Sequence, residues 1–176
     1  DEGKPHTGAD DNASGVSVMI ELAKALKAAG QPSRTLLFIA FSAEEVGLKG
    51  SAYYADHPRM PLDQLMGVIN LDTVGRLGND KISVLGTGTA SEWQHIFRGA
   101  GFVTGVENRL IPDSMQSSDQ MSFIRKNVPA FQLFTSAHAD YHRPSDTADK
   151  IDAAGLVKVA SFAREGIAYL AERPTP

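Results

Sequence analysis

The sequence predicts an α/β fold in which a largely parallel, mixed central sheet lies between helices. Apolar runs of strand length alternate along the chain with segments that repeat apolar residues at helical spacing, as is typical of a sheet covered by helices. The 176 residues are 42% hydrophobic and 22% charged. This balance suits one globular domain with a sizeable core.

Five segments have the pattern of helices. In the first, Val16, Met19, Ile20 and later apolar residues recur at helical spacing until Gly30 and Pro32 end the pattern. The last carries a long apolar stripe from Leu156 to Leu170. The expected helices cover residues 14–29, 48–56, 91–100, 119–126 and 151–172.

Four apolar runs of strand length lie between these helices, at residues 35–42, 67–72, 81–85 and 130–135. The first, Thr-Leu-Leu-Phe-Ile-Ala-Phe-Ser, is apolar almost throughout, so we expect a strand buried on both faces. In sheets of this type, functional sites gather at the carboxyl ends of the strands. We therefore expect the functional residues to follow these runs directly.

Composition excludes several classes of function. The chain has no cysteine, so it has no disulfide framework, thiolate zinc site or cysteine nucleophile. Its net charge is −4 and it has no basic run, so we expect no nucleic-acid partner. No stretch approaches the ~18 apolar residues of a membrane span, so we expect none in this chain. The first residues contain no part of a signal peptide.

Acidic residues and one histidine stand where the predicted strands end or a helix begins. Asp72 ends the run at 67–72, and Glu44 and Glu45 follow the run at 35–42. His142 lies in the loop after the fourth run. Two further carboxylates immediately precede the first helix, Asp10 and Asp11. Because strand ends meet at one edge of a sheet, these side chains can converge there.

Each of these residues also has a structural explanation. Asp11 can cap the first helix, Glu44 and Glu45 can form a solvated loop pair, and an isolated histidine such as His142 is commonly structural. Taken together they favour a metal site, because clustered like charges repel unless a cation neutralises them. Oxygen and imidazole ligands without thiolate suit zinc, manganese or cobalt.

Four motifs resemble those of the clan-MH co-catalytic zinc aminopeptidases. This group includes the secreted bacterial leucyl-type aminopeptidases and has glutamate carboxypeptidase II and glutaminyl cyclase as relatives. The motifs are Gly-Ala-Asp-Asp-Asn-Ala-Ser-Gly at 8–15, Ala-Glu-Glu-Val-Gly-Leu-Lys-Gly-Ser at 43–51, Asn-Leu-Asp at 70–72 and Tyr-His-Arg-Pro-Ser-Asp-Thr at 141–147. The resemblance implies a zinc-exopeptidase-like fold and hydrolysis of the amino-terminal peptide bond of peptides or proteins.

The resemblance also implies roles for individual residues. Asp10 would bridge two zinc ions, Glu45 and His142 would complete one zinc site, and Asp72 would serve the other. Glu44 would be the general base. The peptide bond between Asp10 and Asp11 would be cis.

The resemblance further places Tyr141 and His138 at the substrate rim and implies an extracellular or periplasmic location. The family has one more ligand, a histidine in a His-x-Asp motif upstream of the first motif. Only nine residues precede Asp10, and His6 is the only histidine among them. We therefore expect residues 1–176 to be the C-terminal larger part of a single peptidase catalytic domain, with the second zinc site incomplete.

Two alternatives remain open at this stage. A glutaminyl cyclase-like acyltransferase uses one zinc on the same fold, and Asp10, Glu45 and His142 would suit it. A non-catalytic peptidase-like interaction domain is the other, although the presence of the ligands and of Glu44 argues against decay of the site. Activity on amino-terminal glutamine peptides and zinc binding would separate these alternatives. The sequence predicts neither side-chain preference nor oligomeric state.

Overall fold

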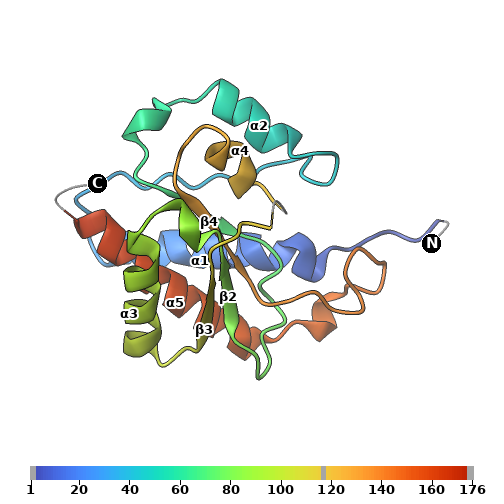
Figure 1. Ribbon diagram of the computed structural model, residues 1–176. Coiled ribbons are helices and arrows are strands. Elements are labelled where there is room, and N and C mark those ends of the chain that lie inside the picture. Colours follow the sequence, from blue (N-terminus) through green and yellow to red (C-terminus); the bar gives the residue numbers. More distant parts are fainter. Residues whose placement is uncertain (1–2, 116–117, 174–176) are drawn as a thin grey trace.

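The computed structural model describes residues 3–115 and 118–173, and it has a four-stranded sheet at its centre (Figure 1). The strand order is β1-β4-β2-β3. β4 pairs in parallel with β1 and antiparallel with β2, while β2 and β3 are parallel. The mixed, mostly parallel α/β sheet predicted from the sequence is confirmed. The strands are β1 (Val68–Leu71), β2 (Ile82–Leu85), β3 (Asn108–Ile111) and β4 (Ala130–Phe134).

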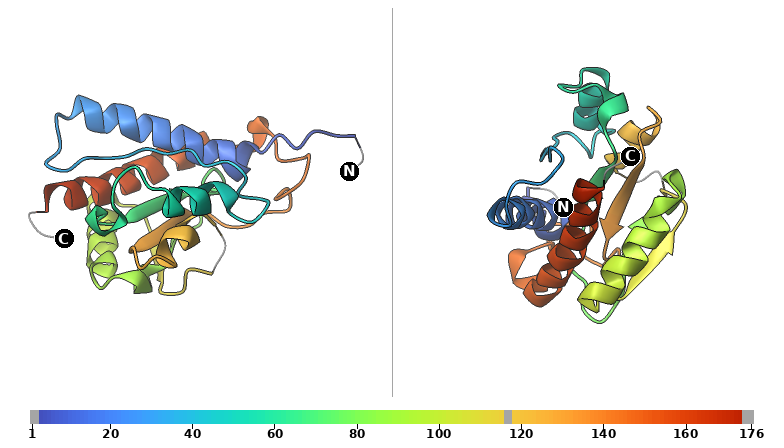
Figure 2. Two further views of the ribbon diagram at one scale, coloured as in Figure 1. Left: turned by 90° about the horizontal axis from the view of Figure 1, so that it is seen from above. Right: turned by 90° about the vertical axis from the view of Figure 1, so that its left-hand side faces the viewer.

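Helices cover both faces of this sheet. α1 and α5 run side by side along one face (Figure 2), and α3 packs against α5 there. α4 lies on the other face against β4 and β1, with α2 beside it. The helices are α1 (Gly15–Ala28), α2 (Lys49–Asp56), α3 (Glu92–Thr104), α4 (Gln120–Ile124) and α5 (Ala153–Glu172). Short helical turns occur at Ala9–Ser14, Leu62–Gln64, Thr87–Thr89 and Ala148–Lys150.

The main core lies between the sheet and the layer formed by α1, α3 and α5. Phe131 on β4 is its aromatic centre, with ring centroids 4.5 Å from Phe97 and 5.0 Å from Trp93. The ring centroid of Phe162 on α5 lies 5.4 Å from that of Phe97. All four of these side chains are buried. This packing fixes β4 at the middle of the sheet, so its carboxyl end and that of β1 are firmly placed.

Two sequence-based expectations need correction. Residues 35–42 form no strand, because the described residues contain no neighbouring strand that pairs with them. Leu37 and Phe38 in this segment are 49% and 38% exposed, so the segment is not buried on both faces. β3 was not predicted, since Asn108 and Arg109 interrupt its short apolar pattern.

Among the helices of residues 3–115 and 118–173, none combines the length and the apolar composition that a membrane span requires.

Candidate metal centre

The carboxyl end of β1 meets the beginning of α1, and glycine makes the contact possible. A Cβ at Gly15 would lie 2.3 Å from the carbonyl oxygen of Leu71, closer than side-chain and backbone atoms approach. Asn12 spans the same junction, because its Nδ2 donates to the Leu71 carbonyl at 2.8 Å and its Oδ1 accepts from the Gly15 N–H. The irregular turn before α1 is thereby held beside Asp72, the residue that follows β1.

Three side chains from separate segments meet at this junction. His142 Nε2 lies 3.0 Å from Asp11 Oδ2 and 3.4 Å from Glu45 Oε1. One ligand atom of each of these three residues lies within 4.8 Å of the others. His142 has a left-handed backbone with φ of 56°, and the Tyr141 ring stacks on its imidazole at a centroid distance of 3.8 Å. Two carboxylates and one imidazole form a donor set that suits zinc.

Asp10 does not belong to this group, although the sequence motif predicted it as the bridging ligand. Its side chain is fully buried. One carboxylate oxygen accepts from the Gly75 N–H, and the other lies 2.9 Å from His138 Nε2. Asp11 takes the position beside Glu45 and His142. The cis peptide bond likewise lies one residue later than predicted, between Asp11 and Asn12.

Asp72 and Glu44 lie close to the three-residue group. Asp72 is buried at the end of β1, and its Oδ1 accepts from the Thr73 hydroxyl at 3.1 Å. Burial raises the pKa of Asp72, and hydrogen bonds from Ser118 and Thr73 oppose that rise. The predicted ligand role of Asp72 stays a prediction, because Asp72 lies outside the group of Asp11, Glu45 and His142.

The electrostatics of the site come from burial and from crowded negative charge. Burial, followed by the charges of Asp72 and Glu45, raises the pKa of Asp11 to about 7. Burial and the same two charges also raise the pKa of Glu44 to about 7. Such a group is the environment in which a divalent cation is stabilised, since it neutralises several carboxylates together. A carboxyl with a pKa near 7 also suits general acid–base catalysis at neutral pH.

The two predicted substrate residues lie in different surroundings. Tyr141 is half-buried on the rim of the group, and burial with the charges of Asp11 and Asp72 raises its pKa to about 12. Its hydroxyl therefore stays protonated and able to donate a hydrogen bond. His138 turns inward to Asp10, which is a structural contact. A substrate role for either residue stays a prediction.

Residues 1–167 match the sequence profile of Peptidase family M28. The chain belongs to peptidase family M28. It is 50% identical over 70 residues to aminopeptidase YwaD of Bacillus subtilis, an overlap of 39% of this chain and 15% of that protein. It is 30% identical over 146 residues to leupeptin-inactivating enzyme 1 of Streptomyces exfoliatus, which covers 81% of this chain and 32% of that enzyme.

Solved structures agree with the M28 assignment. The zinc aminopeptidase BSAP from Bacillus subtilis matches with a TM-score of 0.84 at 28% identity, covering 96% of this chain and 44% of the other. An aminopeptidase from Aneurinibacillus sp. strain AM-1 matches with a TM-score of 0.79 at 31% identity, covering 96% and 40%. This M28 chain therefore spans less than half the length of these relatives.

Sequence reasoning missed two functional candidates in the M28 chain. Asp11 stands next to the residue chosen as ligand, and the adjacent pair of aspartates was the signal that either could serve. Asp146, the aspartate of the fourth motif, was given no functional role of its own. In the structure its carboxylate is buried and contacts the segment that carries Asp11.

Proposed function

We propose that this chain carries the main catalytic residues of a zinc-dependent aminopeptidase. The observation that carries the proposal is the convergence of Asp11, Glu45 and His142 on one point, beside Asp72 and Glu44. Asp11, Glu45 and His142 would hold one zinc ion. Asp11 and Asp72 would serve a second. The zinc aminopeptidases among its structural relatives support this function.

Zinc, when bound here, supplies Lewis-acid polarisation of the scissile carbonyl and lowers the pKa of water. Glu44 takes a proton from the attacking water on a carboxylate oxygen and returns it to the nitrogen of the leaving amine. Its pKa of about 7 suits both transfers. Asp72 and Asp11 attract the positively charged amino terminus of the substrate, which favours cleavage of the first residue. The Tyr141 hydroxyl is available to donate to the scissile carbonyl oxygen.

The direct test is an activity assay on the full-length protein. It should release amino-terminal residues from peptides, lose this activity to a chelator and regain it with zinc. Substrates blocked by amino-terminal acetylation should resist, because they lack the charged amine. Cleavage of blocked peptides at the same rate would contradict the exopeptidase assignment, and a zinc-free protein with no activity would favour an interaction domain.

One observation favours a second candidate. In the described residues the candidate ligand group contains Asp11, Glu45 and His142, with Asp72 outside it, and three ligands suffice for a single zinc. A glutaminyl cyclase-like acyltransferase would need only this site. Conversion of amino-terminal glutamine peptides, without release of leucine from leucyl substrates, would support it.

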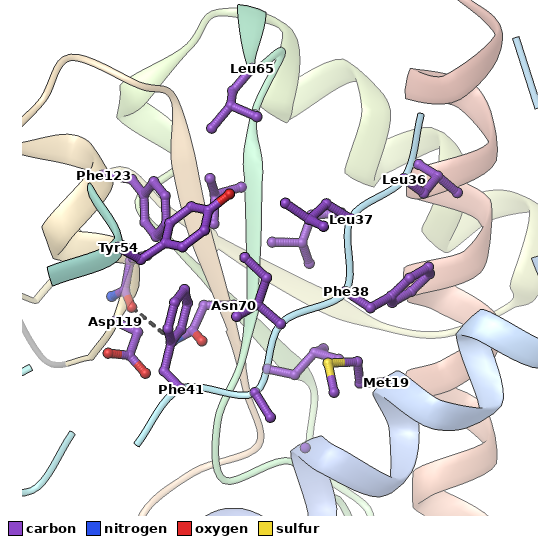
Figure 3. A pocket seen from close by; sticks show the side chains of 18 of the residues that line it. Met19, Leu36, Leu37, Phe38, Phe41, Tyr54, Leu65, Asn70, Asp119 and Phe123 are labelled. Atoms are coloured by element: carbon purple, nitrogen blue, oxygen red, sulfur yellow. Dashed lines mark hydrogen bonds between the residues drawn. The ribbon is translucent and has the colours of Figure 1, made fainter. Parts of the chain in front are cut away.

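We also propose that residues 1–176 form the larger part of one catalytic domain, in which a further strand fills a slot beside β1. The slot is a cavity of about 710 Å³ between β1 and residues 35–41 (Figure 3). Leu37 points from that segment toward β1, and Tyr54 and Phe123 line the other side. β1 pairs only with β4 among the described strands, so its second edge is free to bind a strand.

The slot also reaches the metal centre, because Asp11, Glu44 and Asp72 contribute to its lining. A strand in it would end beside Asp72 and bring a further ligand there. Leu37→Ala in the full-length protein tests this proposal. If a strand covers Leu37, the substitution should cost about 2–5 kcal/mol of unfolding free energy. Phe102→Ala is the control, since Phe102 is 91% exposed on α3 and should cost less than about 0.5 kcal/mol. Equal, small losses would contradict the proposal.

A further inference from the structure

Asp146 connects the two segments that supply Asp11 and His142. Its carboxylate is 2% exposed, and Oδ2 accepts from the main-chain N–H groups of Asp10 at 2.8 Å and Asp11 at 3.1 Å. Its carbonyl oxygen accepts from the Ala9 N–H at 3.2 Å and from the Thr7 hydroxyl. One buried residue therefore contacts most of the segment at 7–11.

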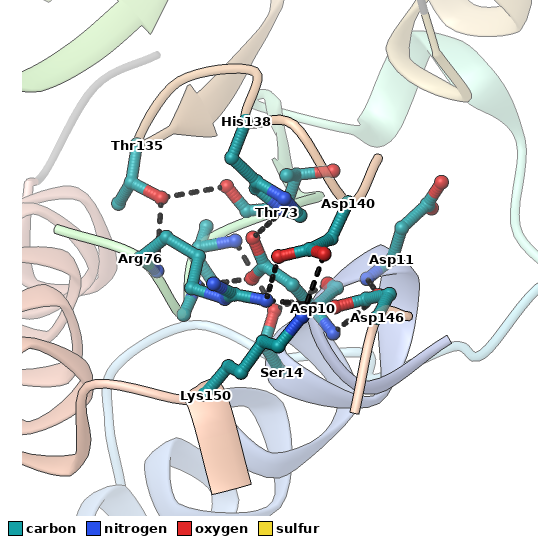
Figure 4. A network of polar contacts seen from close by, with 12 residues as sticks. Asp10, Asp11, Ser14, Thr73, Arg76, Thr135, His138, Asp140, Asp146 and Lys150 are labelled. Atoms are coloured by element: carbon teal, nitrogen blue, oxygen red, sulfur yellow. Dashed lines mark hydrogen bonds and ion pairs between the residues drawn. The ribbon is translucent and has the colours of Figure 1, made fainter. Parts of the chain in front are cut away.

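Arg76 holds the other oxygen of the same carboxylate. Its Nη2 lies 3.3 Å from Asp146 Oδ1 and 3.4 Å from Asp140 Oδ2, and Lys150 Nζ lies 2.6 Å from Asp140 Oδ1 (Figure 4). Arg76 follows Gly75, whose N–H donates to Asp10. The network thus joins the segment after β1, the segment before α1 and the loop after β4.

Hydrogen bonds constrain the backbone at both ends of this connection. Asp146 is four residues after His142, and its own N–H donates to the Arg143 carbonyl at 3.0 Å. At the other end, Asp11 itself carries both the N–H that binds Asp146 and the carboxylate that lies 3.0 Å from His142 Nε2. A shift of either segment would break the bonds to Asp146 and separate Asp11 from His142 together.

We propose that Asp146, oriented by Arg76, is a positioning residue that sets the Asp11 carboxylate at the metal centre. It lies outside the group of Asp11, Glu45 and His142 and acts through two main-chain N–H groups. Charge-assisted bonds of this kind are shorter and about twice as strong as neutral ones. Partners that orient metal ligands typically contribute about 10–100-fold to metal affinity or activity. The inference rests on the proposed function, because it assumes that Asp11 is a zinc ligand.

Asp146→Asn in the full-length protein tests the proposal, with Asp140→Asn as the matched control. Asparagine has the shape of aspartate but one acceptor oxygen, so it satisfies either the two N–H groups or Arg76. Asp140→Asn disturbs Arg76 and Lys150 without touching the segment at 7–11. We expect zinc affinity, measured by chelator competition, to fall about 10–100-fold in Asp146→Asn and to stay within threefold in Asp140→Asn.

A second measurement works without metal. Hydrogen exchange of the Asp10 and Asp11 amides should speed up in Asp146→Asn and remain unchanged in Asp140→Asn. If Asp146→Asn does not fold, Arg76→Lys replaces it, and its zinc affinity should fall more than that of Asp140→Asn. Unchanged amide exchange, or equal zinc affinity in the test variant and the control, would overturn the inference alone. A wild-type protein that binds no zinc would overturn the proposed function and this inference together.

Discussion

Replacing Asp10 and Asp11 one at a time should show which of the two aspartates stabilises the fold and which binds the metal. Asp10→Asn keeps the acceptor for the Gly75 N–H but replaces the oxygen that lies 2.9 Å from His138 Nε2. One hydrogen bond to a charged, fully buried group is lost, which costs about 1.5–3 kcal/mol. For a domain of about 150–250 residues, each kcal/mol lowers Tm by about 2–4 °C. The expected loss is therefore about 3–12 °C.

Asp11→Asn should behave in the opposite way. In the metal-free protein, Asp11 is crowded by the charges of Asp72 and Glu45. Removing its charge relieves repulsion, so the metal-free Tm should be equal to or higher than that of the wild type. Zinc affinity should fall by more than the ~10–100-fold typical of losing an outer partner, because a ligand itself is lost.

The assay combines thermal unfolding of chelator-treated protein with zinc affinity measured by competition. We expect Asp10→Asn to lower mainly the Tm and Asp11→Asn to lower mainly the zinc affinity. A folded Asp10→Asn that binds no zinc, beside an Asp11→Asn that binds it normally, would show that Asp10 is the ligand. The geometry of the group at His142 would then be refuted.

Three further predictions address the base, the core and the charge of the site. Glu44→Gln should lower kcat by about 10²–10⁴-fold with zinc content unchanged, and unchanged turnover would exclude Glu44 as the base. Phe131→Ala should lower the free energy of unfolding by about 3–5 kcal/mol in denaturant titrations, since Phe131 is fully buried. The raised pKa values of Asp11 and Glu44 mean that the folded, metal-free protein binds protons more tightly than the unfolded chain. The free energy of unfolding of the metal-free protein should therefore fall as pH rises from about 4 to about 7. A free energy of unfolding that stays constant over this pH range would contradict the raised pKa values of the two carboxyls.

Local sequence patterns predicted the elements whose partners lie within this chain. The helices at 14–29 and 151–172 were confirmed within two residues at each end as α1 and α5, because their apolar stripes pack on each other and on the sheet. The run at 35–42 has an equally clear strand pattern and forms no strand. A strand needs a neighbour for its backbone hydrogen bonds, and a pattern of side chains carries no information about whether that neighbour is present.

The candidate site shows the same division between local pattern and tertiary context. The resemblance grouped Glu45 with His142, and the structure brings these two side chains to 3.4 Å from each other. His142 lies in the loop after β4, whereas Glu45 follows the segment at 35–42, which is not part of the sheet. The motifs did not distinguish Asp10 from Asp11, which are identical side chains on adjacent residues. That choice depends on the backbone path of the turn, where the N–H groups of both residues bind Asp146. Asp146 lies 135 residues away from Asp11 in sequence, so no local pattern predicts it.

The distribution of cations around the site explains why its carboxylates remain available to a metal. Arg76 and Lys150 pair with Asp146 and Asp140, and Asp146 accepts from the main-chain N–H groups of Asp10 and Asp11 (Figure 4). Among the ion pairs of residues 3–115 and 118–173, the partner of Asp11 and Glu45 is His142, with no lysine or arginine. The lysine and arginine side chains therefore neutralise the carboxylates that hold the turn at 9–14 in place. Within the described residues, Asp11 and Glu45 are left without such a partner, and a bound divalent cation would neutralise them.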